Sequence, residues 1–165
     1  MRTKLLSLFA AALLLAACET TPQTTAGSGG GGAAATAPAA APRTGPVPGS
    51  QQDLVVNVGD RVFFDLDKSD LKPEARRTLE RQAAWLKQYG NVTVTLEGHC
   101  DERGTREYNL ALGDRRAKAA SNYLVSLGIA ATRIKTISYG KERPAVLGSN
   151  EAAWSQNRRS VTVVN

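Results

Sequence analysis

The residues of this sequence whose types and spacing best suit chemistry lie between Gly98 and Arg116. The stretch from Gly98 to Thr105, GHCDERGT, joins an alternating apolar segment to the start of a helical one. Backbone amides at a helix start point outward without partners and favour anions, so this loop is suited to recognition. Spacings of four, three and four residues place four side chains on one stripe of the helix: Thr105, Asn109, Leu112 and Arg116.

Asp101 and Arg116 carry opposite charges that could address the two ends of one small molecule. A carboxylate accepts hydrogen bonds from an ammonium group, and a guanidinium donates a pair of them to a carboxylate. Each such charge-assisted bond contributes about 1.5–3 kcal/mol. The pair therefore suits the zwitterionic end of an amino acid, although the spacing alone equally allows both residues to pair with neighbours on a solvated surface.

Two kinds of enzyme site could be built around the segment His99, Cys100 and Asp101: a cysteine nucleophile or a metal site. A cysteine nucleophile needs a histidine base within hydrogen-bond distance, but consecutive strand residues point to opposite faces, so His99 and Cys100 should diverge. A metal site of Glu97, His99 and Asp101 is geometrically easier, yet catalytic zinc usually has more histidine ligands than this chain's single one. We therefore expect a non-catalytic domain without a metal or other cofactor, in which His99 supports the loop and Cys100 is a small buried thiol.

The pattern of apolar residues predicts the elements that carry these side chains. One helix follows the start at Pro73 and stops at Tyr89, and a second spans about 105–127, with Gly128 closing it. Strands or short strand-like runs are expected at 54–58, 61–64, 92–97, 134–139 and 161–164, with a short helix at 151–156. This order predicts an α+β sandwich with helices on one face of the sheet.

Residues 1–17 have the features of a signal peptide: a basic start followed by an apolar run too short to span a bilayer. The run ends in LAAC at Cys18, which resembles the lipobox of bacterial lipoproteins, whose cysteine is lipidated after cleavage. An ordinary signal peptide is the alternative. By resemblance to lipoprotein sorting in enteric bacteria, Glu19 favours the outer membrane.

Residues 18–52 are rich in Ala, Gly, Pro and Thr and cannot build a core, so we expect a lipidated cysteine followed by a disordered tether. The folded domain is then expected at 53–165.

The formal charge of the chain is +6, but basic residues are interleaved with acidic ones, which argues against nucleic acid as a partner. Cys18 and Cys100 lie in different settings and are not expected to form a disulfide.

Six motifs are distributed through residues 60–165: FFDLD (63–67), EGHCDERGT (97–105), EYN (107–109), RRA (115–117), YGKERP (139–144) and NRR (157–159). Together they closely resemble the OmpA-like carboxy-terminal domain family, and within it the peptidoglycan-associated lipoproteins. The resemblance implies a mixed four-stranded sheet and non-covalent binding of the diaminopimelate residue of the peptidoglycan stem. Asp101 would hold its ammonium group and Arg116 its carboxylate, with the pocket completed by Thr105, Asn109 and Leu112, and at its rim by Phe64 and Asp65.

The resemblance also implies partners and a location. The expected partners are the β-propeller protein TolB and other Tol components, with TolB competing for an overlapping surface. The protein is expected at the periplasmic face of the outer membrane, where the lipid anchor holds it, with a role in cell division and envelope integrity.

One departure from the family pattern is Cys100, which stands where most relatives have a small residue such as Ala. A rival reading is an interaction protein that binds only a protein partner, with the charges of Asp101 and Arg116 incidental.

Overall fold

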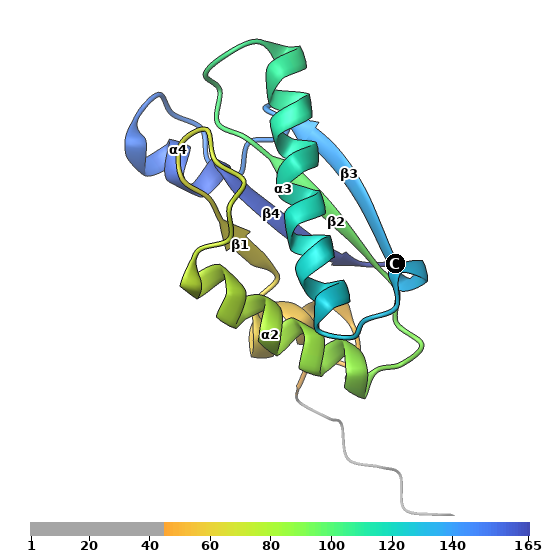
Figure 1. The fold of residues 1–165 in the computed structure, drawn as a ribbon. Helices are drawn as coiled ribbons and strands as arrows, with labels where there is room; N and C mark the ends of the chain where they lie inside the picture. The colour runs from red at the N-terminus through yellow and green to blue at the C-terminus, as the bar shows by residue number, and fades with distance from the viewer. Residues whose placement is uncertain (1–44) are drawn as a thin grey trace, which may run out of the picture. The chain divides into compact units, whose positions relative to one another are not determined.

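A computed structural model describes residues 45–165 of the chain. The predicted signal peptide, Cys18 and most of the predicted tether lie outside the described residues. Four strands form one sheet in the order β1-β4-β2-β3 (Figure 1): β1 Arg61–Phe63, β2 Val94–His99, β3 Ile134–Gly140 and β4 Arg159–Val164. The strand β4 is antiparallel to both of its neighbours, whereas β2 and β3 run parallel. The predicted α+β fold with a mixed four-stranded sheet is confirmed.

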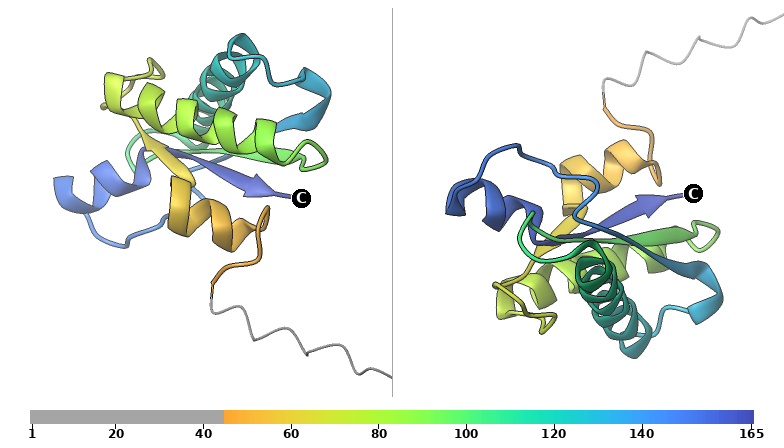
Figure 2. Two further views of the ribbon diagram at one scale, coloured as in Figure 1. Left: turned by 90° about the horizontal axis from the view of Figure 1, so that it is seen from below. Right: turned by 90° about the horizontal axis from the view of Figure 1, so that it is seen from above.

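Two long helices cover one face of this sheet (Figure 2): α2 Pro73–Gln88 and α3 Arg106–Ser126. The short helix α4, Glu151–Asn157, and the amino-terminal helical segment lie on the other side of the sheet from these two. The prediction of helices on one face of the sheet therefore holds for the two long helices, α2 and α3, but not for the two short helical segments. Within residues 45–165, no helix combines the length and the apolar character needed to span a bilayer.

The hydrophobic core lies between the sheet and the two long helices. Leu79 and Leu86 of α2, Leu96 of β2 and Leu124 of α3 are almost completely buried. Each such side chain stabilises the fold by about 1.5–3 kcal/mol relative to an exposed position. The core thus fixes both long helices against the strands.

The predicted strand at 54–58 is wrong, because this run forms a π-helical turn, η1 Leu54–Val58, directly after the helical turn α1 Gln51–Asp53. The side chain of Ser50 accepts a hydrogen bond from the Asp53 amide and starts the turn, and Gly59 ends it with a positive φ of 95°. Ordered helical structure therefore begins at Gln51, before the predicted domain start at Asp53.

The amino-terminal segment also replaces a strand at the sheet edge. The strand β1 is short and leaves β4 without a strand on that side beyond Val161, although β2 pairs with the other side of β4. The Gln51 side chain donates to the Thr162 carbonyl and accepts from the Val164 amide, so it satisfies backbone groups that a longer β1 would have paired.

Glycines allow α3 to approach the sheet closely. A Cβ atom on Gly98 of β2 would lie 1.8 Å from the backbone oxygen of Gly113 in α3. A Cβ on Gly113 would lie 2.3 Å from the Ser138 Oγ of β3. The chain therefore needs glycine at both positions, and the helix that carries Arg116 is seated directly against the end of β2, where the strand has a register shift between Gly98 and His99.

Candidate functional site

A pocket of about 300 Å³ opens where the end of β2, the start of α3 and the loop after β1 meet. Its walls are formed by Leu66, Asp67, Cys100, Asp101, Arg103, Gly104, Tyr108, Asn109, Leu112 and Arg116. Four of the predicted binding residues thus line one pocket: Asp101, Asn109, Leu112 and Arg116. Predicted residues from the loop and from the helix stripe therefore meet in space.

Arg116 lies at the base of the pocket and is completely buried. Its Nε donates to the Lys68 carbonyl at 2.8 Å and its Nη1 to the His99 carbonyl at 2.9 Å. Its Nη1 also donates to the Cys100 Sγ at 3.3 Å, and its Nη2 to the Asp65 carbonyl at 3.1 Å. Since a guanidinium has five N–H donors, these contacts leave one N–H on Nη2.

The predicted use of Arg116 as a two-pronged fork for a carboxylate therefore needs correction. Three backbone carbonyls already hold the guanidinium, which ties the loop after β1 to the end of β2. Burial lowers the pKa of Arg116, but a guanidinium keeps its charge in proteins. Among residues 45–165 no carboxylate forms an ion pair with it, so its buried positive charge can attract an anion into the adjoining pocket.

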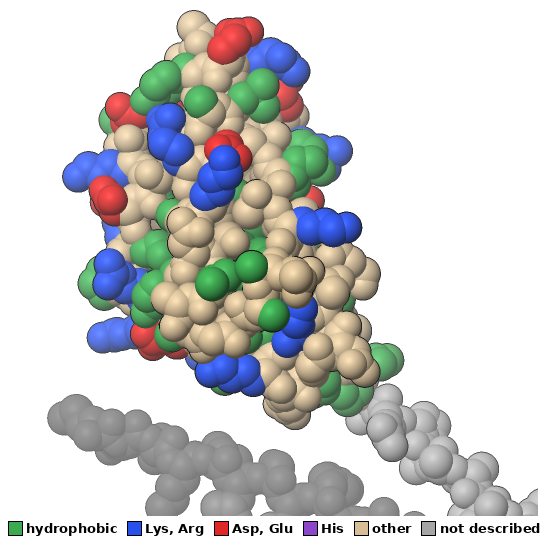
Figure 3. All heavy atoms as spheres, turned by 45° about the vertical axis from the view of Figure 1, so that its right-hand side comes forward, with side chains coloured by type: hydrophobic (Ala, Val, Ile, Leu, Met, Phe, Trp, Pro, Cys, Tyr) green, Lys and Arg blue, Asp and Glu red, His purple; other side chains and the backbone are tan. Residues whose placement is uncertain are grey.

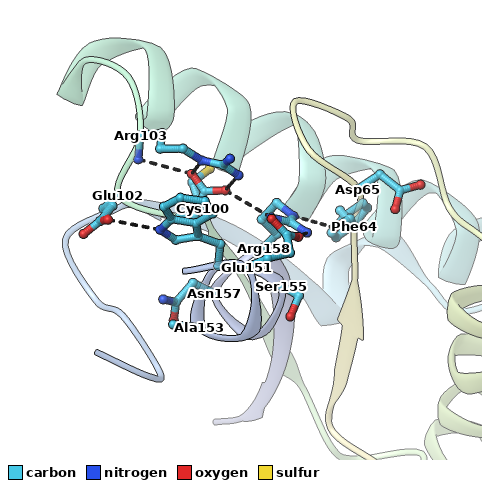
Figure 4. Close-up of polar contacts among 12 residues, drawn as sticks. Phe64, Asp65, Cys100, Glu102, Arg103, Glu151, Ala153, Ser155, Asn157 and Arg158 are labelled. Atoms are coloured by element: carbon cyan, nitrogen blue, oxygen red, sulfur yellow. Dashed lines mark hydrogen bonds and ion pairs between the residues drawn. The ribbon is translucent and has the colours of Figure 1, made fainter. Parts of the chain in front are cut away.

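Asp101 is buried just beyond the end of β2 and is held by two arginines, Arg103 and Arg158, whose positions Figure 4 shows. Arg103 donates to it from Nη2 at 2.6 Å, from Nε at 3.3 Å and from the backbone amide at 3.2 Å. Arg158 donates from Nη1 at 3.3 Å. Burial alone would raise the pKa of Asp101, but the hydrogen bonds from Arg103 outweigh it and lower that pKa. Asp101 is therefore a carboxylate at neutral pH.

Asn109 and Thr105 stabilise the loop before α3 in different ways. Asn109 lines the pocket, and its Nδ2 donates to the carbonyls of Arg103 and Thr105 at 2.7 and 3.0 Å. Thr105 is the N-cap of α3, where its Oγ1 accepts from the Tyr108 amide, and it is exposed outside the pocket wall. The prediction that Thr105 lines the pocket is therefore not met by this geometry.

Phe64 and Asp65 do not form the rim that was predicted for them. The Phe64 ring is buried with the Arg116 guanidinium carbon 5.3 Å from its centroid, so it packs behind the pocket. The Asp65 carboxylate pairs with Lys72 and points away from the arginine cluster in Figure 4. Only its backbone carbonyl reaches Arg116. The rim instead contains Leu66, whose neighbour Asp67 accepts a hydrogen bond from the Tyr108 hydroxyl.

Sequence reasoning missed the two arginines that hold Asp101. Arg103 lies two residues beyond Asp101, and this short spacing was a signal that the two could pair. Arg158 follows α4 and is 57 residues away, so no spacing pattern could have placed it. The Arg103 guanidinium also stacks on Trp154 of α4, 4.0 Å from the ring centroid.

His99 and Cys100 lack the properties of a catalytic pair. Burial and the charges of Arg159 and Arg143 lower the pKa of His99 to about 4, so its ring is neutral at pH 7. Burial raises the pKa of the Cys100 thiol, which opposes thiolate formation. Cys100 is buried, as predicted, and donates to the Asn109 carbonyl at 3.4 Å. Within residues 45–165, no group of three or more His, Cys, Asp or Glu side chains is arranged for metal binding.

Figure 3 shows one face of the molecule, on which lysine and arginine side chains lie at the surface. On the face drawn in Figure 3 they are spread among acidic and apolar side chains rather than gathered in one patch. The positive charges that line the pocket are those of Arg103 and the buried Arg116.

The chain matches known proteins over the region that contains this pocket. Residues 63–158 match the model of the OmpA family. The chain is 60% identical over 117 residues to a peptidoglycan-associated lipoprotein from Agrobacterium fabrum, covering 71% of this chain and 66%, just under two thirds, of that protein. It is 50% identical over 117 residues to the protein of the same name from Pseudomonas putida, covering 70% of each chain.

A solved structure has the same fold. The crystal structure of the peptidoglycan-associated lipoprotein from Burkholderia pseudomallei matches with a TM-score of 0.63 and 40% identity. The match covers 64% of this chain and 90% of the other. Neither this structure nor the related sequences indicate a catalytic family.

Proposed function

This chain belongs to the OmpA family, and from that premise we propose that it is a cell-envelope lipoprotein that binds peptidoglycan without cleaving it. The observation that carries the proposal is the pocket in which the carboxylate of Asp101 and the buried charge of Arg116 face one small volume. Peptidoglycan binding also agrees with the names of the related proteins. The function is attachment of the outer membrane to the cell wall.

The ligand that fits the pocket is the zwitterionic end of diaminopimelate in the peptidoglycan stem. Its carboxylate would lie near Arg116, which offers one N–H and an uncompensated charge. Its ammonium group would lie against Asp101. Its methylene chain would contact Leu112, which is buried in the pocket wall, and Leu66 and Tyr108, which are exposed at the rim.

Anchoring and partners complete the proposal. Cys18 would carry the lipid that holds the protein at the periplasmic face of the outer membrane, and several acyl chains make such an anchor durable. TolB and other Tol components would be the protein partners, with a role in division. The alternative function is binding to a protein partner alone, and the experiment must distinguish it from peptidoglycan binding.

The test is co-sedimentation of the purified full-length protein, in mild detergent, with sacculi. Asp101→Asn should weaken binding about tenfold or more, because it removes the charge that pairs with the ligand ammonium group. Asp114→Asn is the matched control, since Asp114 lies on α3, pairs with Lys118 and is outside the pocket. Circular dichroism verifies that both variants fold. Equal sedimentation of all three proteins would exclude this pocket, and no sedimentation of any would favour a protein partner.

A further inference from the structure

We propose that Arg103 is a gate that occupies the ammonium position of the pocket and must leave Asp101 before the ligand binds. The inference rests on the proposed function and concerns the regulation of the same site. Its basis is that a cation of this chain already fills the place where a ligand cation would bind.

The carboxylate of Asp101 has no acceptor capacity left for a ligand. Its Oδ1 accepts from the backbone amide and Nε of Arg103, and its Oδ2 accepts from Arg103 Nη2 and Arg158 Nη1. A carboxylate offers about four lone-pair positions, and four hydrogen bonds fill them. A ligand ammonium group must therefore displace one of the two guanidinium groups.

Arg103 is the arginine that can move. The Arg158 side chain is only 7% exposed, and it also donates to the Phe64 carbonyl and to Glu151. The Arg103 side chain is 34% exposed, and both of its side-chain hydrogen bonds go to Asp101. Displacing Arg103 therefore breaks one ion pair between a partly exposed arginine and the buried Asp101, whereas displacing Arg158 would break a buried network.

Trp154 provides a support for the Arg103 side chain. The indole N–H of Trp154 donates to Glu102, 3.0 Å away, which fixes the ring next to Arg103. The guanidinium lies 4.0 Å from the ring centroid, within range of a cation–π interaction. Arg103 can therefore release Asp101 while its side chain keeps contact with Trp154.

The gate makes the pocket selective for a ligand that has both charges. With Arg103 on Asp101, the charge that remains uncompensated in the pocket is the positive charge of Arg116. A ligand carboxylate is attracted to that charge, and its adjoining ammonium group then competes with Arg103 for Asp101. A ligand with only an ammonium group has to displace Arg103 against the repulsion of Arg116.

The experiment is calorimetric titration of the full-length protein with a soluble diaminopimelate muropeptide. Arg103→Ala should bind about fivefold more tightly than wild type, because the competing ion pair is gone. Arg106→Ala is the matched control: it also removes one positive charge, and its side chain is 61% exposed, pairs with Glu142 and lies outside the pocket. Its affinity should equal that of wild type.

Binding by Arg103→Ala that is equal to or weaker than that of wild type would overturn the proposal that Arg103 is a gate. Weaker binding would mean that Arg103 itself contacts the ligand. The pKa of the Asp101 carboxyl, followed by carbon NMR, gives a readout without ligand. Arg103→Ala should raise that pKa, and an unchanged value also overturns the gate. If no variant binds the muropeptide, the proposed function fails, while the Asp101 pKa still decides whether Arg103 holds the carboxylate.

Discussion

At the scale of single residues, Arg116 combines a structural and a recognition role. Its guanidinium bridges the carbonyls of Asp65, Lys68 and His99, which come from two separate segments, while its charge faces the pocket. A buried cation without a carboxylate partner is costly for folding. Such a cost is reduced when a ligand supplies the anion, so ligand binding should also stabilise the fold.

Arg116→Lys keeps the charge but places its three N–H donors on one nitrogen, which cannot reach carbonyls that contact three different nitrogens of the guanidinium. We expect it to lower the free energy of unfolding by about 2–4 kcal/mol, because buried acceptors lose their donors. Urea unfolding measures this loss. Arg115→Lys, at the exposed neighbouring position, should be neutral, and equal stability of the two variants would contradict the bridging role.

His99 predicts a loss of stability in mild acid. Its pKa is about 4 in the folded protein and about 6.5 when unfolded, so the unfolded state binds more protons between these values. The histidine's contribution to stability therefore falls as the pH drops from 6.5 to 4, by about 3 kcal/mol in total. His99→Gln should remove this part of the pH dependence, since the chain has one histidine. Parallel stability curves for the two proteins from pH 7 to pH 4 would refute the assignment.

The sequence predicts those site residues that are related by local spacing along one helix. It does not predict contacts between segments that only the fold brings together. Asn109, Leu112 and Arg116 share a helix stripe, and the structure places all three in the pocket. The carbonyl partners of Arg116 could not be foreseen, because any backbone segment can supply a carbonyl. Arg158 reaches Asp101 only because α4 folds back beside the end of β2.

At the scale of elements, periodicity worked where one face of an element is buried. The helix expected between Pro73 and Tyr89 is observed as Pro73–Gln88, because its apolar stripe packs on the sheet. The run 54–58 was misjudged because valine-rich composition favours strands, yet Val55 and Val56 are exposed, while Leu54 is in the core and Val58 packs against it. Tertiary contacts of Gln51 and Asp53 decide its conformation.

The contact between β2 and α3 gives a prediction at this scale. Gly98→Ala should destabilise the fold by about 3 kcal/mol, because the added Cβ meets the Gly113 backbone and cannot be accommodated by a rotamer change. It should also weaken sacculus binding, since α3 carries Arg116. Thermal unfolding and co-sedimentation test both effects. Gly90→Ala, where a Cβ meets nothing within 4 Å, is the control, and similar behaviour of the two would contradict the close packing.

At the scale of the whole molecule, the proposed attachment to the wall and the proposed attachment to the membrane are separate. The pocket lies within residues 66–116, whereas the proposed lipid site is Cys18. The segment between Cys18 and residue 45 could reach about 90 Å at full extension. The domain could therefore bind the wall at a distance from the membrane.

Cys18→Ser should consequently release the protein from the membrane fraction without changing its affinity for sacculi. Cell fractionation and co-sedimentation measure the two properties independently. A variant that stays in the membrane fraction would show that Cys18 is not the anchor. A variant that loses sacculus binding would show that the two attachments are coupled.

The most direct test of the central claim compares two muropeptides that differ only in the third stem residue, diaminopimelate or lysine. Lysine has the ammonium group but lacks the second carboxylate, so it cannot use the charge of Arg116. Calorimetry with the full-length protein should show binding of the diaminopimelate form and at least about tenfold weaker binding of the lysine form. Equal affinity for both would contradict recognition of a zwitterionic end by Asp101 and Arg116.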